Sequence, residues 1–158
     1  SSAASDVYKR QLFDRSVSHA TYEQQENGKV VLEGVIAMAR ACLENDIPVG
    51  LGTDTGCPYV THYDMWRELC YFVKYCGVTP AFALHSATLL NARLAGIDSV
   101  TGSVEAGKAA DLIVCDRDPL ADLSALRSLH MVIKDGVRIE HPAVKKLPEV
   151  ERELDKFL

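Results

Sequence analysis

The sequence predicts an α/β protein that contains one strand of a parallel barrel and the helices on either side of it. Residues 48–56, Pro-Val-Gly-Leu-Gly-Thr-Asp-Thr-Gly, are typical of a buried strand that ends in a carboxylate and a turn. Helical patterns precede and follow this stretch, which is the alternation found in βαβ units. Parallel barrels keep their chemistry at the C-terminal ends of the strands, where this acid lies.

The composition is that of an ordinary globular chain. Of 158 residues, 47% are apolar and 25% are charged, which is enough for one domain with a sizeable core. The net charge of −5 gives no indication of a nucleic-acid partner. No apolar run approaches the ~20 residues that span a bilayer, so we expect no membrane partner. Five cysteines without a Cys-x-x-Cys pair are interpreted as reduced thiols, which predicts a cytoplasmic location.

Residues 1–27 are polar and lack a clear periodicity, so we expect a tail or loop there. Within it, residues 6–11, Asp-Val-Tyr-Lys-Arg-Gln, resemble the in-frame translation of a transposase adapter used in sequencing libraries. An ordinary polar tail is the alternative interpretation. If the adapter interpretation holds, the segment has no part in the fold.

An amphipathic helix is predicted from Gly28 to Asn45, directly before the strand. Its apolar positions recur at helical spacing and are Val31, Val35, Met38, Ala39 and Cys42. In the strand, alternate side chains face opposite sides, so Val49 and Leu51 face one side while two glycines and Asp54 face the other. Glycines weaken a strand unless something must approach closely, so the side that leads to Asp54 is expected to be cleared.

Further helices are predicted after the loop 55–61. The spacing of Trp66, Leu69, Cys70 and Val73 predicts the first of them, and a glycine at 77 closes it. Thr79 as N-cap and Pro80 at the first helical position start the next helix. One more short helix is predicted over 88–94.

From residue 97 onward the pattern changes to short strands. Segments of strand type occur at 102–104, 112–115, 131–134 and 137–139. Between the last two, Asp135-Gly136 is the strongest short hairpin signal and predicts a type I′ turn. A charged helix is predicted from near Pro148 to the end. Because a complete barrel needs eight strands and typically ~250 residues, we expect the chain to be the tail of a larger protein.

The motif at 52–56, Gly-Thr-Asp-Thr-Gly, resembles the last metal-site motif of the metal-dependent amidohydrolase superfamily, in the branch with imidazolonepropionase-like enzymes and prolyl dipeptidases. Three further blocks agree with that family in order and spacing: His62 with Glu68-Leu69, residues 77–88, and residues 102–113. The resemblance covers roughly residues 28–140.

This resemblance implies a (β/α)₈ TIM barrel with a small β-sandwich built from both chain ends. Residues 28–96 would then be the C-terminal part of the barrel, comprising its last strand and flanking helices. Residues 97–141 would be part of the sandwich, 142–158 a helical tail, and 1–27 an N-terminal tail. The resemblance also implies one or two divalent metal ions, with zinc the expected ion. Of the ligand positions that such enzymes use, only the aspartate of the last strand is present, and it is Asp54.

The expected role of Asp54 is that of metal ligand and general base. A metal ion lowers the pKa of water towards ~7, and a carboxylate beside that water can take its proton and pass it to the departing amine. The implied reaction is hydrolysis of a C–N bond in a small-molecule or dipeptide substrate, such as an amide or lactam. The alternative is that Asp54 only caps the turn before the next helix.

Other candidate residues are weaker. His62 follows the motif and is a candidate for the border of the substrate pocket, although a solvated loop histidine is the alternative. Asp111 is interpreted as a structural acceptor for turn amides, and His85 as a surface residue. Cys57 has no neighbour in the sequence that would activate it, so we expect it to be inert.

Two rival interpretations come from other classes. Asp54-Thr55-Gly56 is also the motif of aspartic proteases, which pair two such carboxylates; their folds are almost all β, so the helices around the motif argue against them. The other rival is a truncated, non-catalytic fragment that lacks most metal ligands and is partly ordered or oligomeric. A homo-oligomer, the identity of the substrate and the number of metal ions are left open by the sequence.

Overall fold

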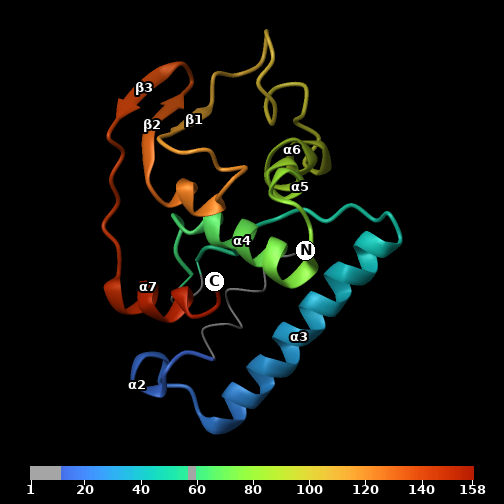
Figure 1. Ribbon diagram of the computed structural model, residues 1–158, viewed down its shortest axis with the longest axis vertical. Helices are drawn as coiled ribbons and strands as arrows, with labels where there is room; N and C mark the ends of the chain where they lie inside the picture. Colours follow the sequence, from blue (N-terminus) through green and yellow to red (C-terminus); the bar gives the residue numbers. More distant parts are fainter. Residues whose placement is uncertain (1–11, 57–59) are drawn as a thin grey trace.

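The computed structural model describes residues 12–56 and 60–158, and it mixes helices with one small sheet (Figure 1). The helices and strands are α2 (Arg15–Ser18), α3 (Tyr22–Glu44), α4 (Met65–Cys76), α5 (Pro80–His85), α6 (Asn91–Leu94), β1 (Leu112–Cys115), β2 (Leu129–Lys134), β3 (Val137–Glu140) and α7 (Pro148–Asp155). In Figure 1, α4 lies near the centre, with the sheet on one side and the long α3 on the other.

Helix α3 begins six residues earlier than the predicted start at Gly28. Thr21 and Gln24 form a capping box: the Thr21 hydroxyl accepts from the Gln24 amide at 3.2 Å, and the Gln24 side chain accepts from the Thr21 amide at 2.9 Å. The predicted tail over 1–27 is therefore wrong for the part of it that the structure describes, which also includes α2. The first turns of α3 are polar and carry no apolar periodicity, so the cap defines the helix start. The predicted adapter segment, 6–11, lies outside the described residues.

The stretch before Asp54 does not form the predicted strand, because residues 47–54 belong to no sheet in the described chain. A strand needs a hydrogen-bonded neighbour, and here the side chain of Asn91 in α6 takes that place. Its Oδ1 accepts from the Leu51 amide at 3.0 Å, and its Nδ2 donates to the Leu51 carbonyl at 2.7 Å. Val49 and Leu51 are each 7% exposed, so the predicted buried side is confirmed although the strand is wrong.

Gly50 explains how α6 can come so close. A Cβ atom at this position would lie 2.5 Å from Asn91 Oδ1 and 2.9 Å from Leu94 Cδ1, distances that real Cβ atoms do not adopt. A close approach at this glycine is therefore confirmed, but the expectation that this side is cleared is wrong at Gly50, where Asn91 and Leu94 of α6 occupy it. The neighbour that approaches is the helix that holds the Leu51 backbone.

The core lies between this stretch, α4, α5 and a 3₁₀ turn at Leu123–Arg127. Its buried side chains are Val49, Leu51, Leu69, Phe72, Ala83 and Leu123. The predicted ends of the helices are confirmed: Gly77 closes α4 with a φ of 73°, and the Thr79 hydroxyl caps α5 by accepting from the Phe82 amide.

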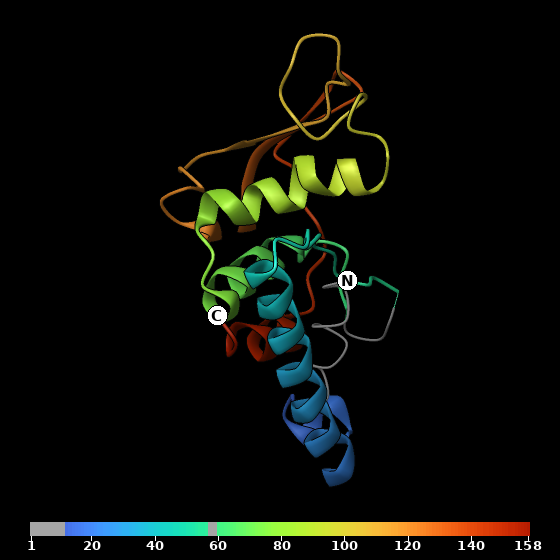
Figure 2. The same ribbon diagram turned by 90° about the vertical axis from the view of Figure 1, so that its right-hand side faces the viewer.

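The predicted separate helix over 88–94 is instead a continuation of α5. A π-helical turn at Ser86–Leu90 joins α5 to α6, and Figure 2 shows the three pieces as one rod between the sheet and α4. His85 on this rod is exposed, as predicted. None of the described helices has both the length and the hydrophobicity that crossing a membrane requires.

The sheet is antiparallel in the order β1-β2-β3, with Leu112 opposite Ile133 and Val132 opposite Ile139. Asp135 and Gly136 have φ values of 51° and 80°, which confirms the type I′ hairpin turn. Asp111 accepts from the Asp135 amide at 2.8 Å, so its predicted structural role is confirmed. The predicted strand at 102–104 is absent from the described residues. The division into barrel and sandwich parts stays a prediction.

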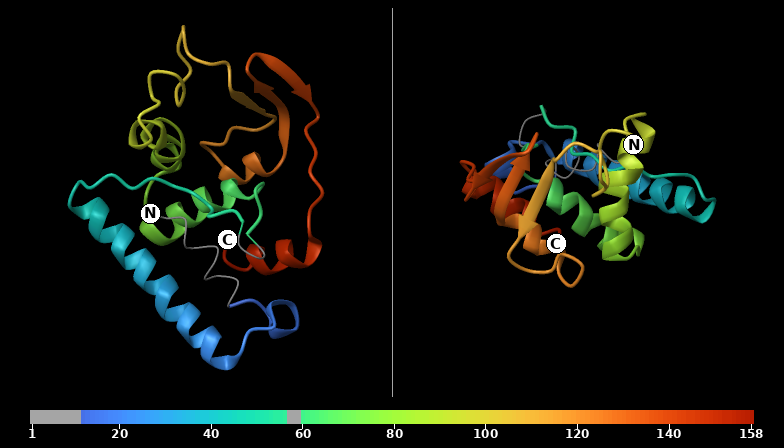
Figure 3. Two further views of the ribbon diagram at one scale, coloured as in Figure 1. Left: turned by 180° about the vertical axis from the view of Figure 1, so that it is seen from behind. Right: turned by 90° about the horizontal axis from the view of Figure 1, so that it is seen from above.

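Helix α7 starts at Pro148, as predicted, and lies beside α4 and the described segment around Phe13 (Figure 3). Phe13, which is fully buried, contacts Val150 and Leu154 of α7. On the other side, the Tyr71 hydroxyl of α4 donates to the Leu154 carbonyl at 3.0 Å. These contacts connect the two ends of the described chain through one short helix.

A cluster of charged side chains, which we call the Arg67 network, also joins α4 to α7. It consists of Arg67 with Asp64, Glu151, Asp155 and Arg127. Arg67 makes two parallel hydrogen bonds of 3.1 Å to Glu151 and one of 2.7 Å to Asp155, and it also contacts Asp64. The opposite charges of this network lie close together, and Arg67, Asp64 and Glu151 are buried.

We expect Gly50→Ala to destabilise the fold, because the added methyl group would displace the Asn91 amide from the Leu51 backbone. Losing those bonds at a half-buried site should cost about 1–3 kcal/mol of unfolding free energy. The matched control is Gly34→Ala in α3, where a Cβ meets no atom within 4 Å; it should stabilise by about 0.5–1 kcal/mol. Urea unfolding measures both, and an equal effect of the two changes would contradict the role assigned to Asn91.

We also expect the stability contributed by Asp155 to be lost in acid. Burial acts to raise the pKa of Asp155, but hydrogen bonds from Arg67 and Arg127 more than offset it and hold the pKa below its ordinary value. The ionised form therefore stabilises the fold above the unfolded pKa of about 4, and this contribution disappears as the pH falls through the lower folded pKa.

Asp155→Asn should consequently lower the urea midpoint of unfolding at pH 7. The difference in midpoint between this variant and the wild type should become smaller below about pH 3. Glu149→Gln, on the exposed side of the same helix, serves as the control and should leave the midpoint unchanged. A gap between Asp155→Asn and the wild type that stays constant from pH 7 to pH 2 would show that the ion pairs contribute nothing.

Candidate functional site

Asp54 lies at the end of the stretch that Asn91 holds, and its side chain is exposed. Its φ of 57° places it in the left-handed region, which is uncommon for a residue other than glycine and is found often at functional sites. On either side, the hydroxyls of Thr53 and Thr55 share a hydrogen bond of 2.7 Å. The backbone thus turns sharply at Asp54 and leaves its carboxylate open to solvent.

The carboxylate of Asp54 has no hydrogen bond or ion pair within the described parts of the chain. The alternative that Asp54 only caps a turn therefore has no supporting hydrogen bond there. The N-cap residue of the next helix, α4, is Asp64 and not Asp54. Asp54 therefore has an exposed carboxylate without a partner among the described residues, and it follows a backbone stretch that α6 holds in place. Such a carboxylate is able to bind a cation or accept a proton.

His62 lies in the turn that leads from the Asp54 segment to α4, and it is exposed. Its ring meets the Tyr63 ring edge-on, with centroids 5.3 Å apart, and the Tyr63 hydroxyl accepts from the Leu147 amide at 3.1 Å. Among the described residues, no hydrogen bond, ion pair or ring contact joins His62 directly to Asp54. The pocket role of His62 stays a prediction, and Cys57 lies outside the described residues.

The donor atoms of the chain fit a metal site only in part. Asp54 offers an oxygen ligand of the kind that divalent metals use, whereas a catalytic zinc site normally has three protein ligands and a water. Among residues 12–56 and 60–158, no three His, Cys, Asp or Glu side chains lie together in a way that could hold a metal ion. Within the described residues, Asp54 therefore offers a single oxygen donor, which by itself does not make a metal site.

The cysteines that the structure describes, Cys42, Cys70, Cys76 and Cys115, are free thiols, in agreement with the sequence analysis for these four. Burial raises the pKa of the Cys70 thiol to about 11, and burial also raises the pKa of Cys76. Neither thiol is therefore an activated nucleophile at neutral pH.

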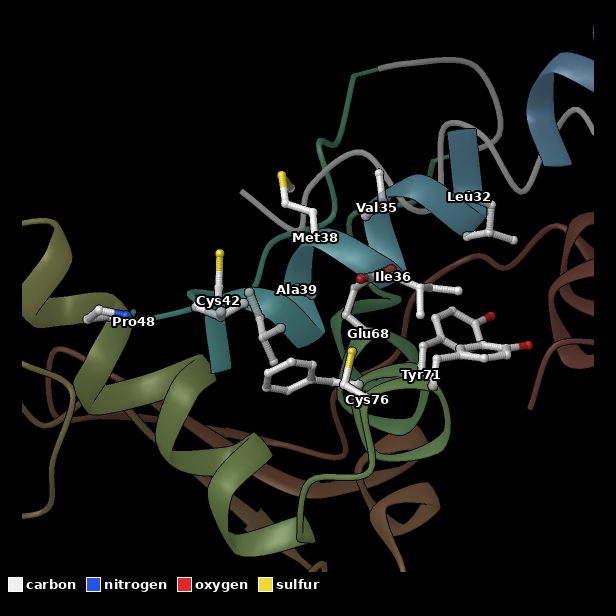
Figure 4. Close-up of a pocket in the computed structure, with 14 residues that line it drawn as sticks. Leu32, Val35, Ile36, Met38, Ala39, Cys42, Pro48, Glu68, Tyr71 and Cys76 are labelled. Atoms are coloured by element: carbon white, nitrogen blue, oxygen red, sulfur yellow. The ribbon is translucent and has the colours of Figure 1, made fainter. Parts of the chain in front are cut away.

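A groove lined by α3, α4 and the stretch 48–51 lies next to this part of the core (Figure 4). Apolar side chains line most of it, including Val35, Met38 and Phe72, and Glu68 is the one charged residue in its lining. Helix α3 still exposes apolar side chains, such as Met38 at 48%. A surface with so few polar groups is suited to packing against other apolar residues and not to chemistry.

Sequence reasoning missed two residues around the candidate site: Asn91, which holds the Leu51 backbone, and Arg67, which contacts Asp64 in the turn of His62. Asn91 is 40 residues from the backbone that it holds, and no local pattern connects the two. One hint was available, because asparagine is an unfavourable residue inside a helix. Arg67 stands on the buried side of α4 among apolar neighbours, and its partner Glu151 is 84 residues away.

The chain belongs to the amidohydrolase family, whose family model matches residues 10–139. The resemblance found in the sequence is thereby confirmed.

Similar proteins include enzymes and solved structures of this family. The chain is 35% identical over 80 residues to imidazolonepropionase of Picrophilus torridus, which is 51% of this chain and 20% of that protein. It matches the crystal structure of a "putative prolidase" from Bifidobacterium longum with 40% identity and a TM-score of 0.90, over 98% of this chain and 38% of that one. A Xaa-Pro dipeptidase structure with bound methionine in its active site matches with 31% identity and a TM-score of 0.72, over 88% of this chain and 33% of that one.

The chain therefore spans only about a fifth of the curated relative's length and about a third of the two solved chains. Its fold agrees closely with the corresponding third of the Bifidobacterium longum structure. The remaining two thirds of such a protein have no counterpart in these 158 residues.

Proposed function

We propose that this chain is the C-terminal part of a metal-dependent hydrolase that cleaves a C–N bond in a small substrate. The observation that carries the proposal is the carboxylate of Asp54, which is exposed, has no partner among the described residues, and ends a stretch fixed by Asn91. Membership of the amidohydrolase family supports the reaction type. The substrate classes are an amide, a lactam or a dipeptide.

In this proposal the metal ion, zinc by expectation, supplies Lewis-acid activation of water. The Asp54 carboxylate would hold the ion as one of several ligands. It would also serve as the base that accepts a proton from water and as the acid that returns it to the leaving amine. Because solvent reaches Asp54 and no cation of the described residues neutralises it, its charge is available for both tasks.

A dipeptide with a C-terminal proline is the first substrate to test. The matches to the putative prolidase and to the Xaa-Pro dipeptidase cover 98% and 88% of this chain. The match to imidazolonepropionase covers 51% of it. His62 would border the substrate pocket. A small-molecule substrate, the absence of a nucleic-acid partner, a cytoplasmic location and a homo-oligomer all remain predictions.

The second candidate is that the 158-residue chain by itself is a fragment without catalysis. Its donor set supports this, because no three metal-binding side chains come together in the described residues. The half-covered apolar side of α3 supports it as well, since the groove there is suited to further packing. The two candidates are compatible if the activity belongs to a longer protein.

We expect the purified 158-residue chain to bind zinc weakly and to hydrolyse no dipeptide, because a single carboxylate in water does not hold the ion. Mixing it with a separately expressed upstream portion of the same reading frame should produce metal binding and hydrolysis only in the mixture. Elemental analysis after gel filtration measures the metal. About one equivalent of tightly bound zinc in the lone chain, together with dipeptide hydrolysis, would overturn the fragment interpretation.

In the full-length protein, Asp54→Asn should lower kcat by at least ~10²-fold, because the amide keeps the size of the side chain but cannot accept a proton. Metal content should fall less, since the other ligands remain. The matched control is Asp46→Asn, an exposed aspartate that also has a positive φ, of 55°, and it should leave kcat unchanged. Turnover by Asp54→Asn at the wild-type rate would exclude Asp54 from the mechanism.

A further inference from the structure

The turn at 61–64, which follows the Asp54 segment and carries His62, is attached to the first turn of α4 by a buried carboxylate. The Asp64 side chain accepts hydrogen bonds from the Thr61 hydroxyl and from the Arg67 guanidinium. Asp64 and Arg67 are fully or almost fully buried. The position of the turn is therefore coupled to the position of the Arg67 side chain.

Arg67 is held in turn by α7. Its guanidinium forms a fork on Glu151, with both bonds at 3.1 Å, and reaches Asp155 at 2.7 Å. Paired bonds of this kind fix the direction of the guanidinium as well as its distance. The ring of Trp66 lies 4.6 Å below it, so the plane of the guanidinium is also fixed.

A second connection between the turn and α7 does not involve Arg67. The Leu147 amide, one residue before α7, donates to the Tyr63 hydroxyl at 3.1 Å. The Tyr63 ring packs edge-on against His62. The His62 ring is thus two contacts away from the start of α7 by this route.

The Arg67 network is not expected to raise the free energy of unfolding by much over an apolar arrangement of the same size. Buried ion pairs often contribute little net stability, because taking the charges out of water offsets their attraction. In addition, Arg67 Nε is buried and has no hydrogen-bond partner among the described residues, which is unfavourable. What such a network does provide is a fixed arrangement of its members, since breaking one pair leaves a buried charge uncompensated.

We propose that helix α7 is a positioning element for the candidate site: through Arg67 and Tyr63 it fixes the turn 61–64 and so holds His62 in place for the substrate. This inference rests on the proposed function, in which His62 borders the substrate pocket. Asp54 is not a member of the network. Loosening α7 should therefore weaken substrate binding and raise KM, while the chemical step, kcat, changes little.

The test compares Glu151→Gln with Glu149→Gln. The first removes the charge that pairs with Arg67, and the second makes the same change at an exposed position of the same helix. Tyr63→Phe removes the hydroxyl that accepts from the Leu147 amide and keeps the ring that packs against His62. It therefore breaks only the second connection. The first measurement is amide hydrogen exchange of residues 61–67 in the 158-residue chain. The second is KM and kcat for Xaa-Pro dipeptides in the full-length protein.

We expect faster exchange at 61–67 in Glu151→Gln, with a KM raised at least ~threefold and kcat within about twofold of the wild type. Tyr63→Phe should change both quantities in the same direction but less, and Glu149→Gln should change neither. Exchange at the wild-type rate in Glu151→Gln would overturn the proposal. Faster exchange with an unchanged KM would also overturn it, since α7 would then be a structural clamp only.

If Glu151→Gln does not fold, Asp155→Asn replaces it, because that change removes only the bonds at the partly exposed edge of the network. If the wild-type full-length protein binds metal but hydrolyses no C–N substrate, the proposed function fails. The coupling of α7 to the turn is then decided by exchange alone, and faster exchange in Glu151→Gln or Asp155→Asn supports it while unchanged exchange overturns it.

Discussion

The pair of hydrogen bonds between the Asn91 amide and the Leu51 backbone determines where Asp54 lies. A backbone segment that is partly buried must have its polar groups satisfied, and Leu51 has no strand beside it in the described chain. Asn91 supplies one donor and one acceptor, as a neighbouring strand would. Gly50 makes the approach of α6 possible, and Val49 and Leu51 then anchor the segment in the core. Asp54 follows directly at a turn with positive φ, so the candidate site depends on this contact.

Local features of the sequence predicted the local structure well. The caps of α4 and α5, the Asp135-Gly136 turn and strand β1 all follow from short-range chemistry, and all are confirmed. The structural role of Asp111 is confirmed as well, through a hydrogen bond from the Asp135 amide 24 residues away. The start of α3 was placed too late because its first turns are polar. The strand at 48–54 was wrong because a strand is a property of two segments, and pairing cannot be read from one.

The site itself was predictable only as far as its single acid. Asp54 could be singled out because it follows a glycine-containing apolar stretch and matches a family motif. The residue that places it could not, since Asn91 acts on a backbone 40 residues away. A separation of 84 residues also lies between Tyr63, in the turn of His62, and Leu147, the residue before α7.

The central claim is that Asp54 is a metal ligand in a longer hydrolase. The most direct test is anomalous diffraction from crystals of the zinc-loaded full-length protein. The account predicts a zinc peak about 2.0–2.2 Å from a carboxylate oxygen of Asp54, with histidine or carboxylate ligands from the upstream part completing the site. A zinc ion bound by other residues, with the Asp54 carboxylate turned away from it, would contradict the account.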